Sequence, residues 1–269
     1  MEELSLVFFT VLAQAAAGTA LMLAVLGCHA GNHDRQQIFL PGYISVLTLL
    51  GIAGLASLTH LGQPLRAMNV IFGLFHGSPL SVEIITVSLF GAAITLLIGL
   101  KLKQHPLSTK PMIPIIGALS GMLMVYAISR VYNIQTVEAW YHVTTPLQFF
   151  TTAAVLGVGT VSLLTAFYDI ESVLLRIMSV VSLILVFIVI GSHQQHIGTL
   201  ENMGDVASTQ FLMWLRYGLL ACGGFLWLFP MLAKLKSDTG YIASGVVMIL
   251  LSELAGRAYF YDLIQQRVF

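Results

Sequence analysis

A histidine, an arginine and a glutamate with complementary chemistry lie close together in the sequence. They are His60, Arg66 and Glu83, and Glu83 opens a long apolar stretch. A quinol that is oxidised must give up its hydroxyl protons, and these need acceptors that work near neutral pH. Histidine meets this need, and so does a carboxylate at the edge of a hydrocarbon layer. The three residues therefore predict a site for a hydroxyl-bearing donor that arrives through lipid.

Other charged residues also intrude on apolar stretches, and they fall toward the same end. Arg130 closes one stretch, Arg216 lies inside another, and Glu253 and Arg257 lie in the last one. A charge in hydrocarbon costs several kcal/mol unless it is paired or faces the protein interior. The one-sided distribution thus predicts a polar site near one face of a membrane.

Plainer interpretations of these charges remain open. Arg66 and Arg267 have long side chains that can extend from a helix end to the membrane surface. Glu253 and Arg257 stand at positions i and i+4, where an ion pair would only stabilise the last helix. Glu83 lies near a helix start, where a carboxylate complements the helix dipole.

The composition indicates what kind of element positions these residues. Hydrophobic residues make up 57% of the chain and charged residues 9%, with a mean hydropathy of +0.89. About a quarter of a soluble domain is charged, so a soluble fold is excluded. A bilayer core of about 30 Å needs about 20 apolar residues of helix. Eight stretches of the chain meet this length, near residues 5–27, 38–59, 82–102, 112–131, 147–168, 173–193, 209–233 and 240–262.

The stretches lack the alternation of β-barrel strands. We therefore predict an all-α fold, a polytopic integral membrane bundle of eight transmembrane helices that forms a single domain over residues 1–269. Membrane lipid is the expected environment, and no nucleic-acid partner is expected. The connection 60–81 contains Gly and Pro and is not expected to form a continuous helix. Its end, Ser78 followed by Pro79, is typical of a helix N-cap and first helical residue.

Positive charges predict the orientation of the bundle, because short cytoplasmic loops collect Lys and Arg. One set of alternate loops holds seven of them, including every lysine, and the other set holds five. The first set is therefore expected to be cytoplasmic. An even number of spans then places both termini, and the charged ends of the spans, on the periplasmic side. The seven are Arg35, Lys101, Lys103, Lys110, Arg176, Lys234 and Lys236, and the five are Arg66, Arg130, Arg216, Arg257 and Arg267.

Intrinsic redox cofactors are not expected. The two cysteines, Cys28 and Cys222, lie at or within apolar stretches and give neither a disulfide framework nor a cysteine-ligated metal, so we assign them to packing. The eight histidines lie in loops or near span ends, whereas membrane haems are held between helices inside the bilayer. His193 and His196 are expected to be interfacial. With no metal and no haem of its own, the chain would pass electrons to a partner subunit.

Four blocks of sequence together resemble the membrane-anchor (C) subunit of bacterial anaerobic dimethyl sulfoxide reductase. They occur in the same order as in that family, and the eight-span layout agrees from end to end. The blocks are HLGQPLRAMN at residues 60–69, Glu83, RVYN from residue 130 with the segment up to Pro146, and ELAGR from residue 253 with Phe260 and Tyr261.

The resemblance implies an anchor in the bacterial cytoplasmic (inner) membrane that carries no cofactor. It would hold two periplasmic partners, a molybdopterin catalytic subunit and a four-cluster iron–sulfur subunit with 4Fe-4S clusters. It would oxidise menaquinol beside the nearest cluster, as the non-catalytic, quinol-oxidising subunit of an oxidoreductase in anaerobic respiration.

The resemblance also implies the residues of the quinol site. The family's histidine, arginine and glutamate match His60, Arg66 and Glu83, of which His60 and Glu83 would accept protons. Met68 stands where we expect an aromatic side chain. The expected quinol-binding set is His60, Gly62, Arg66, Met68, Asn69 and Glu83. A supporting polar cluster comprises Arg130, Tyr132, Asn133, Trp140, Tyr141, Glu253 and Arg257, of which Tyr132, Asn133, Trp140 and Tyr141 would form a docking surface or pocket wall.

Two alternatives are kept. One is the anchor of a related polysulfide or nitrite reductase complex. The other is a proton or anion transporter, which predicts broken helices and a polar track across the membrane. The inner halves of the spans offer Thr160, Ser162 and Thr165 as their best polar residues, and these are ordinary helix-packing residues.

Overall fold

Long α-helices make up nearly all of the described structure. The computed structural model describes residues 4–29, 33–60, 73, 76–200, 207–233 and 239–265. The helices are α1 (Leu4–His29), α2 (Phe39–His60), α4 (Pro79–Leu102), α5 (Met112–Tyr132), α6 (Thr144–Phe167), α7 (Val173–Gly198), α8 (Ala207–Leu232) and α9 (Thr239–Gln265), with short 3-10 turns η1 (His33–Ile38) and η3 (Pro106–Thr109). Within these ranges, eight helices are long and apolar enough to cross a membrane.

The predicted spans are confirmed, and the helices extend beyond them at some ends. The largest difference is in α7, which continues five residues past the predicted end at 193 to Gly198. Polar residues there end the apolar run but not the helix, because hydrogen bonding within the backbone does not require apolar side chains. Ser78 and Pro79 take the predicted N-cap and first positions of α4, although the Ser78 side chain makes no capping hydrogen bond.

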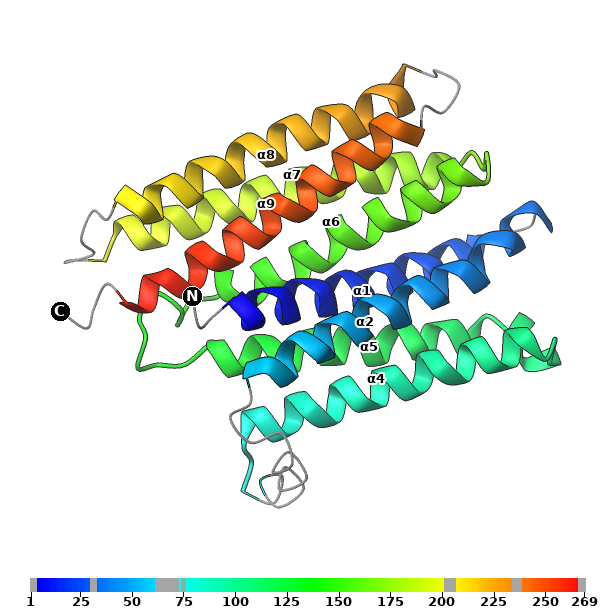
Figure 1. The fold of residues 1–269 in the computed structure, drawn as a ribbon, viewed down its shortest axis with the longest axis horizontal. Helices are drawn as coiled ribbons and strands as arrows, with labels where there is room; N and C mark the ends of the chain where they lie inside the picture. The colour runs from blue at the N-terminus through cyan, green and yellow to red at the C-terminus, as the bar shows by residue number, and fades with distance from the viewer. Residues whose placement is uncertain are drawn as a thin grey trace.

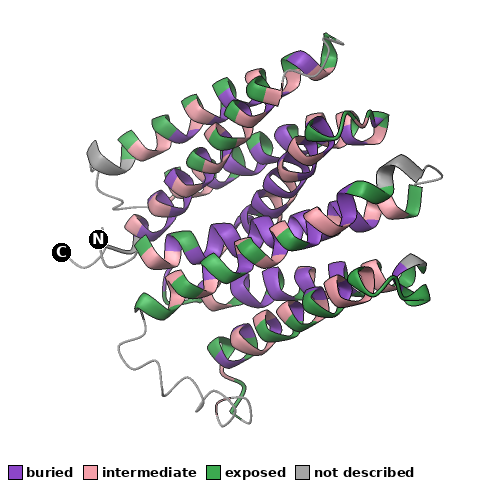
Figure 2. Ribbon diagram, turned by 45° about the vertical axis from the view of Figure 1, so that its right-hand side comes forward, coloured by how far each residue is buried: buried purple, intermediate pink, exposed green. Residues whose placement is uncertain are grey.

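Two helices lie at the centre of the bundle and join its two halves. In α1, 83% of the residues in the apolar window are buried and in α6 72%, against at most 44% in any other span. α1 packs with α2 and α5, which together with α4 form one half, whereas α6 packs with α7 and α9, which with α8 form the other (Figure 1). In Figure 2 the central helices are mostly buried and the outer helices carry exposed faces.

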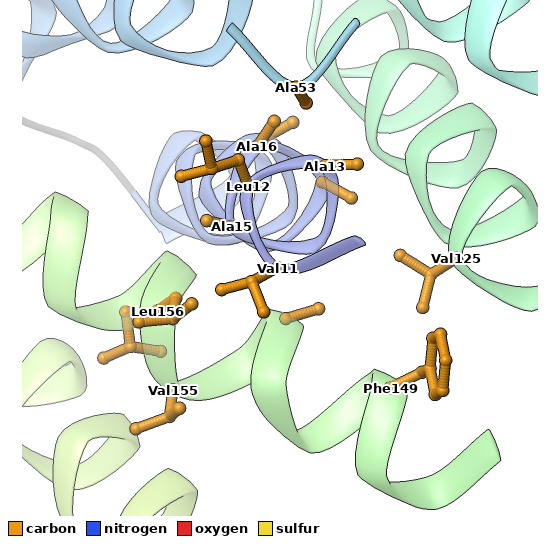
Figure 3. Packing of buried hydrophobic residues seen from close by; sticks show 14 of the residues in the cluster. Val11, Leu12, Ala13, Ala15, Ala16, Ala53, Val125, Phe149, Val155 and Leu156 are labelled. Carbon is orange, nitrogen blue, oxygen red and sulfur yellow. The ribbon is translucent and has the colours of Figure 1, made fainter. Parts of the chain in front are cut away.

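The sequence of α1 explains its central place. It is apolar on all sides and rich in alanine, as expected of a helix surrounded by others. In Figure 3, Ala53 of α2, Val125 of α5 and Leu156 of α6 surround it. At its closest approach to α6, Gly18 faces Gly157, and a Cβ on either glycine would overlap the backbone of the other helix. Small residues thus let the two halves meet closely.

The helix ends fall into two groups. α1 begins and α9 ends at the same end of the bundle, together with the last turns of α2, α5 and α7 and the first turns of α4, α6 and α8 (Figure 1). We call this the terminal end and the other the opposite end. The connections 103–111 and 168–172 lie at the opposite end. The charges that intrude on the spans, including Glu83 and Arg257, lie in the terminal half.

Candidate functional site

Glu83 lies in the second turn of α4 with its side chain turned into the bundle. The residue is only 6% exposed, although α4 is one of the least buried helices. Its Oε2 atom has no hydrogen-bond partner among the described residues. A buried carboxylate without a partner is costly when it is ionised, which makes it a good candidate for a group that binds and releases a proton.

Two tyrosines connect Glu83 with the centre of the bundle. The hydroxyls of Tyr132, at the end of α5, and Tyr261, in α9, both interact electrostatically with the Glu83 carboxylate. Their rings meet edge to face, with centroids 5.3 Å apart. Tyr261 interacts in the same way with Arg257. Glu83 therefore belongs to one electrostatic network with groups on α5 and α9.

An aromatic cluster holds the 133–143 connection against α9. Trp140 stacks on Phe260 with ring centroids 4.9 Å apart, and its Nε1–H donates to the Phe260 carbonyl oxygen at 2.8 Å. Tyr132 contacts both rings and also Phe149 of α6. Tyr132 and Trp140 are thus buried inside the bundle, whereas Tyr141 is 50% exposed.

The other members of the predicted supporting cluster are not all brought together. Arg130 is exposed at the end of α5 and is not part of the buried cluster, contrary to the prediction. Asn133 is half-buried, with its Oδ1 atom lacking a hydrogen-bond partner among the described residues. Glu253 and Arg257 are buried.

Glu253 forms a buried ion pair with Arg216 of α8. The Arg216 Nη2 and Glu253 Oε2 atoms are 3.1 Å apart, and the two side chains are 6% and 1% exposed. Thr152 of α6 donates its hydroxyl to the same carboxylate at 2.6 Å, and Arg216 also donates to the Gln148 amide oxygen at 3.3 Å. The guanidinium lies against Gly256, where any Cβ would overlap it. The pair therefore ties α8 and α9 to α6.

Arg257 makes a separate connection between the two halves. Its Nη2 donates to the Gln14 amide oxygen of α1 at 3.0 Å, and its Cζ lies 3.7 Å from the Phe149 ring centroid, a cation–π contact. The predicted ion pair between Glu253 and Arg257 within the last helix is therefore wrong. Glu253 pairs instead with Arg216. Because Gly256 has no side chain, the Arg216 guanidinium can lie against α9 at this point.

The cluster as a whole is balanced in formal charge and contains unused hydrogen-bonding atoms. Two buried arginines, Arg216 and Arg257, accompany two buried glutamates, Glu83 and Glu253. Among the described residues, these four side chains and the buried Gln14 and Gln148 leave one glutamate oxygen and four nitrogens without a hydrogen-bond partner: Glu83 Oε2, Arg216 Nε, Arg257 Nε, Gln14 Nε2 and Gln148 Nε2. Each of these buried atoms can bond to a water molecule or to a ligand.

Sequence reasoning missed the residues that complete this cluster. Gln14 and Gln148, which are 0% and 4% exposed, were not predicted as members, nor was Thr152. The signal for the two amides was present in the sequence, because a glutamine inside an apolar span needs a partner within the protein. For Thr152 we find no comparable signal, since threonine commonly bonds to its own helix.

A histidine cluster lies beside the polar cluster at the terminal end. His193 lies in the last turns of α7 and is only 2% exposed, and its Nδ1 is 2.9 Å from the Thr144 hydroxyl at the start of α6. The Thr144 hydroxyl also contacts His142, whose ring stacks on His196 at 4.0 Å. Burial and the nearby His196 lower the pKa of His142. Within the described residues, no group of three His, Cys, Asp or Glu could hold a metal ion.

Other predictions fall on residues that the structure describes differently or does not describe. Cys28 and Cys222 are exposed on the surface of the bundle, so their expected role in packing is wrong. His60 is the last residue of α2, but its side chain lies outside the described structure. Gly62, Arg66, Met68 and Asn69 also lie outside the described residues, as does Arg267. Most of the predicted quinol-binding set is therefore untested by the geometry.

The eight apolar helices, with a buried charged cluster at one end, define the chain as a multi-pass membrane protein. The family model of DMSO reductase anchor subunits (DmsC) matches residues 1–263. The chain belongs to this family, as the resemblance of its sequence blocks predicted.

Three relatives of the chain carry related names. The anaerobic dimethyl sulfoxide reductase chain YnfH of Escherichia coli K12 is 31% identical, over 97% of this chain and 94% of the relative. The anaerobic dimethyl sulfoxide reductase chains C of the same organism and of Haemophilus influenzae are each 30% identical over the same shares. The similarity thus extends over nearly the whole length of each protein.

Proposed function

We propose that the chain is the menaquinol-oxidising membrane anchor of a dimethyl sulfoxide reductase type of complex in the bacterial inner membrane. The observation that carries this proposal is Glu83, a buried carboxylate at the terminal end of an apolar helix, whose Oε2 atom has no hydrogen-bond partner among the described residues. Family membership and the names of the relatives support the anchor role and the class of complex.

In the proposed reaction, the protons and the electrons of the quinol leave by different routes. His60 and Glu83 accept the two hydroxyl protons of the quinol, and Arg66 orients the headgroup by hydrogen bonding. Gly62, Met68 and Asn69 complete the site from the same sequence block. The two electrons leave to the nearest iron–sulfur cluster of a partner subunit, because this chain supplies no redox centre in the proposal.

The buried cluster supplies the support for Glu83. Tyr132 and Tyr261 each interact electrostatically with both Glu83 and Arg257, so we propose that these two tyrosines form the wall of the site next to Glu83. The Arg216–Glu253 pair fixes α9, which carries Arg257 and Tyr261. Neither arginine needs to touch the quinol in this account, and both act by holding the wall of the site in place.

The proposal includes two partner subunits on the periplasmic side, a four-cluster iron–sulfur subunit and a molybdopterin catalytic subunit. The exposed Tyr141 and the half-buried Asn133, both in the connection 133–143 at the terminal end, are the side chains proposed to meet the iron–sulfur subunit. The cofactors of the complex reside in these partners. Dimethyl sulfoxide is the proposed terminal acceptor, because it is the substrate in the names of the relatives.

The orientation predicts a labelling pattern that can be measured in intact cells. Lys101 and Lys103 end α4 at the opposite end, which the excess of lysine assigns to the cytoplasm. A lysine reagent that cannot cross the membrane should therefore leave both unmodified until the cells are opened. A C-terminal reporter fusion should be active only in a format that reports the periplasm. Activity of a cytoplasmic reporter at the C-terminus would reverse the proposed orientation and the side of the site.

The experiment that tests the chemistry is Glu83→Gln in the assembled complex. Glutamine has nearly the same shape but cannot take a proton, so menaquinol-driven turnover should fall by at least about a hundredfold. Reduction of the acceptor with a soluble artificial donor should remain, because it bypasses the anchor. The matched control is Glu171→Gln, a glutamate that is 88% exposed at the opposite end. Unchanged menaquinol turnover in Glu83→Gln would show that Glu83 only complements the helix dipole.

A further inference from the structure

A cavity of about 280 Å³ opens at the opposite end of the bundle, away from the candidate quinol site. Its lining residues come from α1, η1, α2, α4, η3 and α5, at the end of these helices that is away from Glu83. Pockets for whole small molecules run from about 300 to 1,000 Å³, so this cavity suits a small polar group.

The side chains that line the cavity offer hydrogen-bond donors and positive charge. Lys101 and Lys110 line it, and no acidic residue is among the described residues that do so. The Lys101 Nζ is held by a hydrogen bond to the Gln36 Oε1 at 3.1 Å and lies 5.2 Å from the centroid of the Phe39 ring. The ammonium is therefore positioned by groups of η1 and α2, and Gln36 accepts from one of its three N–H donors.

A buried hydroxyl gives independent support for a ligand. Tyr43 lines the cavity and is only 1% exposed, and its hydroxyl has no hydrogen-bond partner among the described residues. Buried hydroxyls are normally satisfied, so an unsatisfied one at a cavity wall calls for an acceptor or donor inside the cavity. Ser108, which is 8% exposed, lines the same cavity with a second hydroxyl-bearing side chain.

We propose that this cavity binds a phosphate group, carried either by an anionic phospholipid or by soluble phosphate. A phosphate group offers several charged acceptor oxygens, which match two ammonium groups and hydroxyls from different helices. The cavity lies at the end of transmembrane helices, at the depth of lipid headgroups, where basic pockets between helices bind anionic lipids. The inference does not rest on quinol oxidation, because it concerns the other end of the bundle.

The test is calorimetric titration of the full-length protein, purified in detergent and in phosphate-free buffer. The probes are dihexanoyl phosphatidylglycerol, dihexanoyl phosphatidylcholine and inorganic phosphate. The lipid source predicts saturable binding of phosphatidylglycerol with one site per chain and weaker binding of the other two probes. The soluble source predicts that inorganic phosphate binds as tightly as phosphatidylglycerol and displaces it.

Three variants connect the binding to the cavity. Lys101→Met keeps the apolar stem and removes the charge, so it should weaken binding by about tenfold or more. Tyr43→Phe removes only the unpartnered hydroxyl, so it should weaken binding while the thermal stability of the unliganded protein stays unchanged or rises. Lys103→Met is the matched control, since Lys103 is exposed at the same end and does not line the cavity.

Two results would overturn the proposal. One is the absence of saturable binding of both phosphatidylglycerol and inorganic phosphate to the native protein. The other is an equal loss of affinity in Lys101→Met and Lys103→Met, because that outcome would assign the binding to the general positive charge of this end.

Discussion

The two ends of the bundle each contain a glutamate paired with an arginine, and the pairs differ in surroundings much more than in geometry. At the terminal end, Arg216 and Glu253 are 3.1 Å apart and their side chains are 6% and 1% exposed. At the opposite end, Arg176 and Glu171 are 2.9 Å apart, with 25% and 88% exposed. The two distances are nearly equal, but the expected losses of stability on removing one partner differ. A buried charge left without its partner is costly, whereas an exposed one is solvated by water.

The energetically costly buried charges of this chain lie at the terminal end. The exposed pair links residues five positions apart in a connection and the start of α7, and water can replace either partner. The buried pair links α8 to α9 and is completed by Gln148 and Thr152 of α6. Charges are retained inside the terminal end in spite of their desolvation, which is expected where a site needs a fixed polar wall.

The largest expected effect comes from removing one partner of the buried pair. Glu253→Ala leaves Arg216 buried without a carboxylate, so the free energy of unfolding should fall by about 3–5 kcal/mol. Glu171→Ala, the control at the opposite end, should cost about 0–1 kcal/mol. Unfolding of both purified variants in a titration with sodium dodecyl sulfate measures the difference. Equal losses in the two variants would show that burial does not separate the two pairs.

A smaller effect is expected when both buried charges are replaced together. In the double variant Arg216→Met with Glu253→Met, no charge remains without a partner, so the protein should lose less stability than with Glu253→Ala alone. The same titration checks this expectation. If the pair only holds α9 in place, the assembled double variant should also retain most of its menaquinol turnover. A double variant that loses as much stability as the two single variants together would contradict a coupled pair.

The fold was largely predictable because length and apolar composition directly encode a membrane span. The helix starting at Pro79 illustrates this, since Ser78, Pro79 and the apolar run after Glu83 identified its start in advance. The sequence placed Glu83 only at the edge of the hydrocarbon layer, and the inward turn of its side chain comes from the structure, where the residue is 6% exposed.

Partner choice inside the cluster was not predictable from local spacing. Glu253 has an arginine four positions away, yet it pairs with Arg216, which is 37 residues away in the sequence. Arg257 bonds to Gln14 across 243 residues. Both choices depend on which helices become neighbours and on the space above Gly256, and neither follows from the periodicity of one helix. Residues 60–69 remain a prediction from sequence, since the His60 side chain and the residues after it lie outside the described structure.

The most direct test of the central claim is to place a quinol analogue in the assembled complex and observe the nearest iron–sulfur cluster. Electron paramagnetic resonance would be recorded with and without a menaquinol-analogue inhibitor, for the wild type, His60→Ala and the control His105→Ala at the opposite end. A quinol at the terminal end must lie close to its electron acceptor, so the account predicts a shifted cluster spectrum in the wild type and control that is lost in His60→Ala. Saturable binding of the analogue with no change in any cluster spectrum would contradict the account.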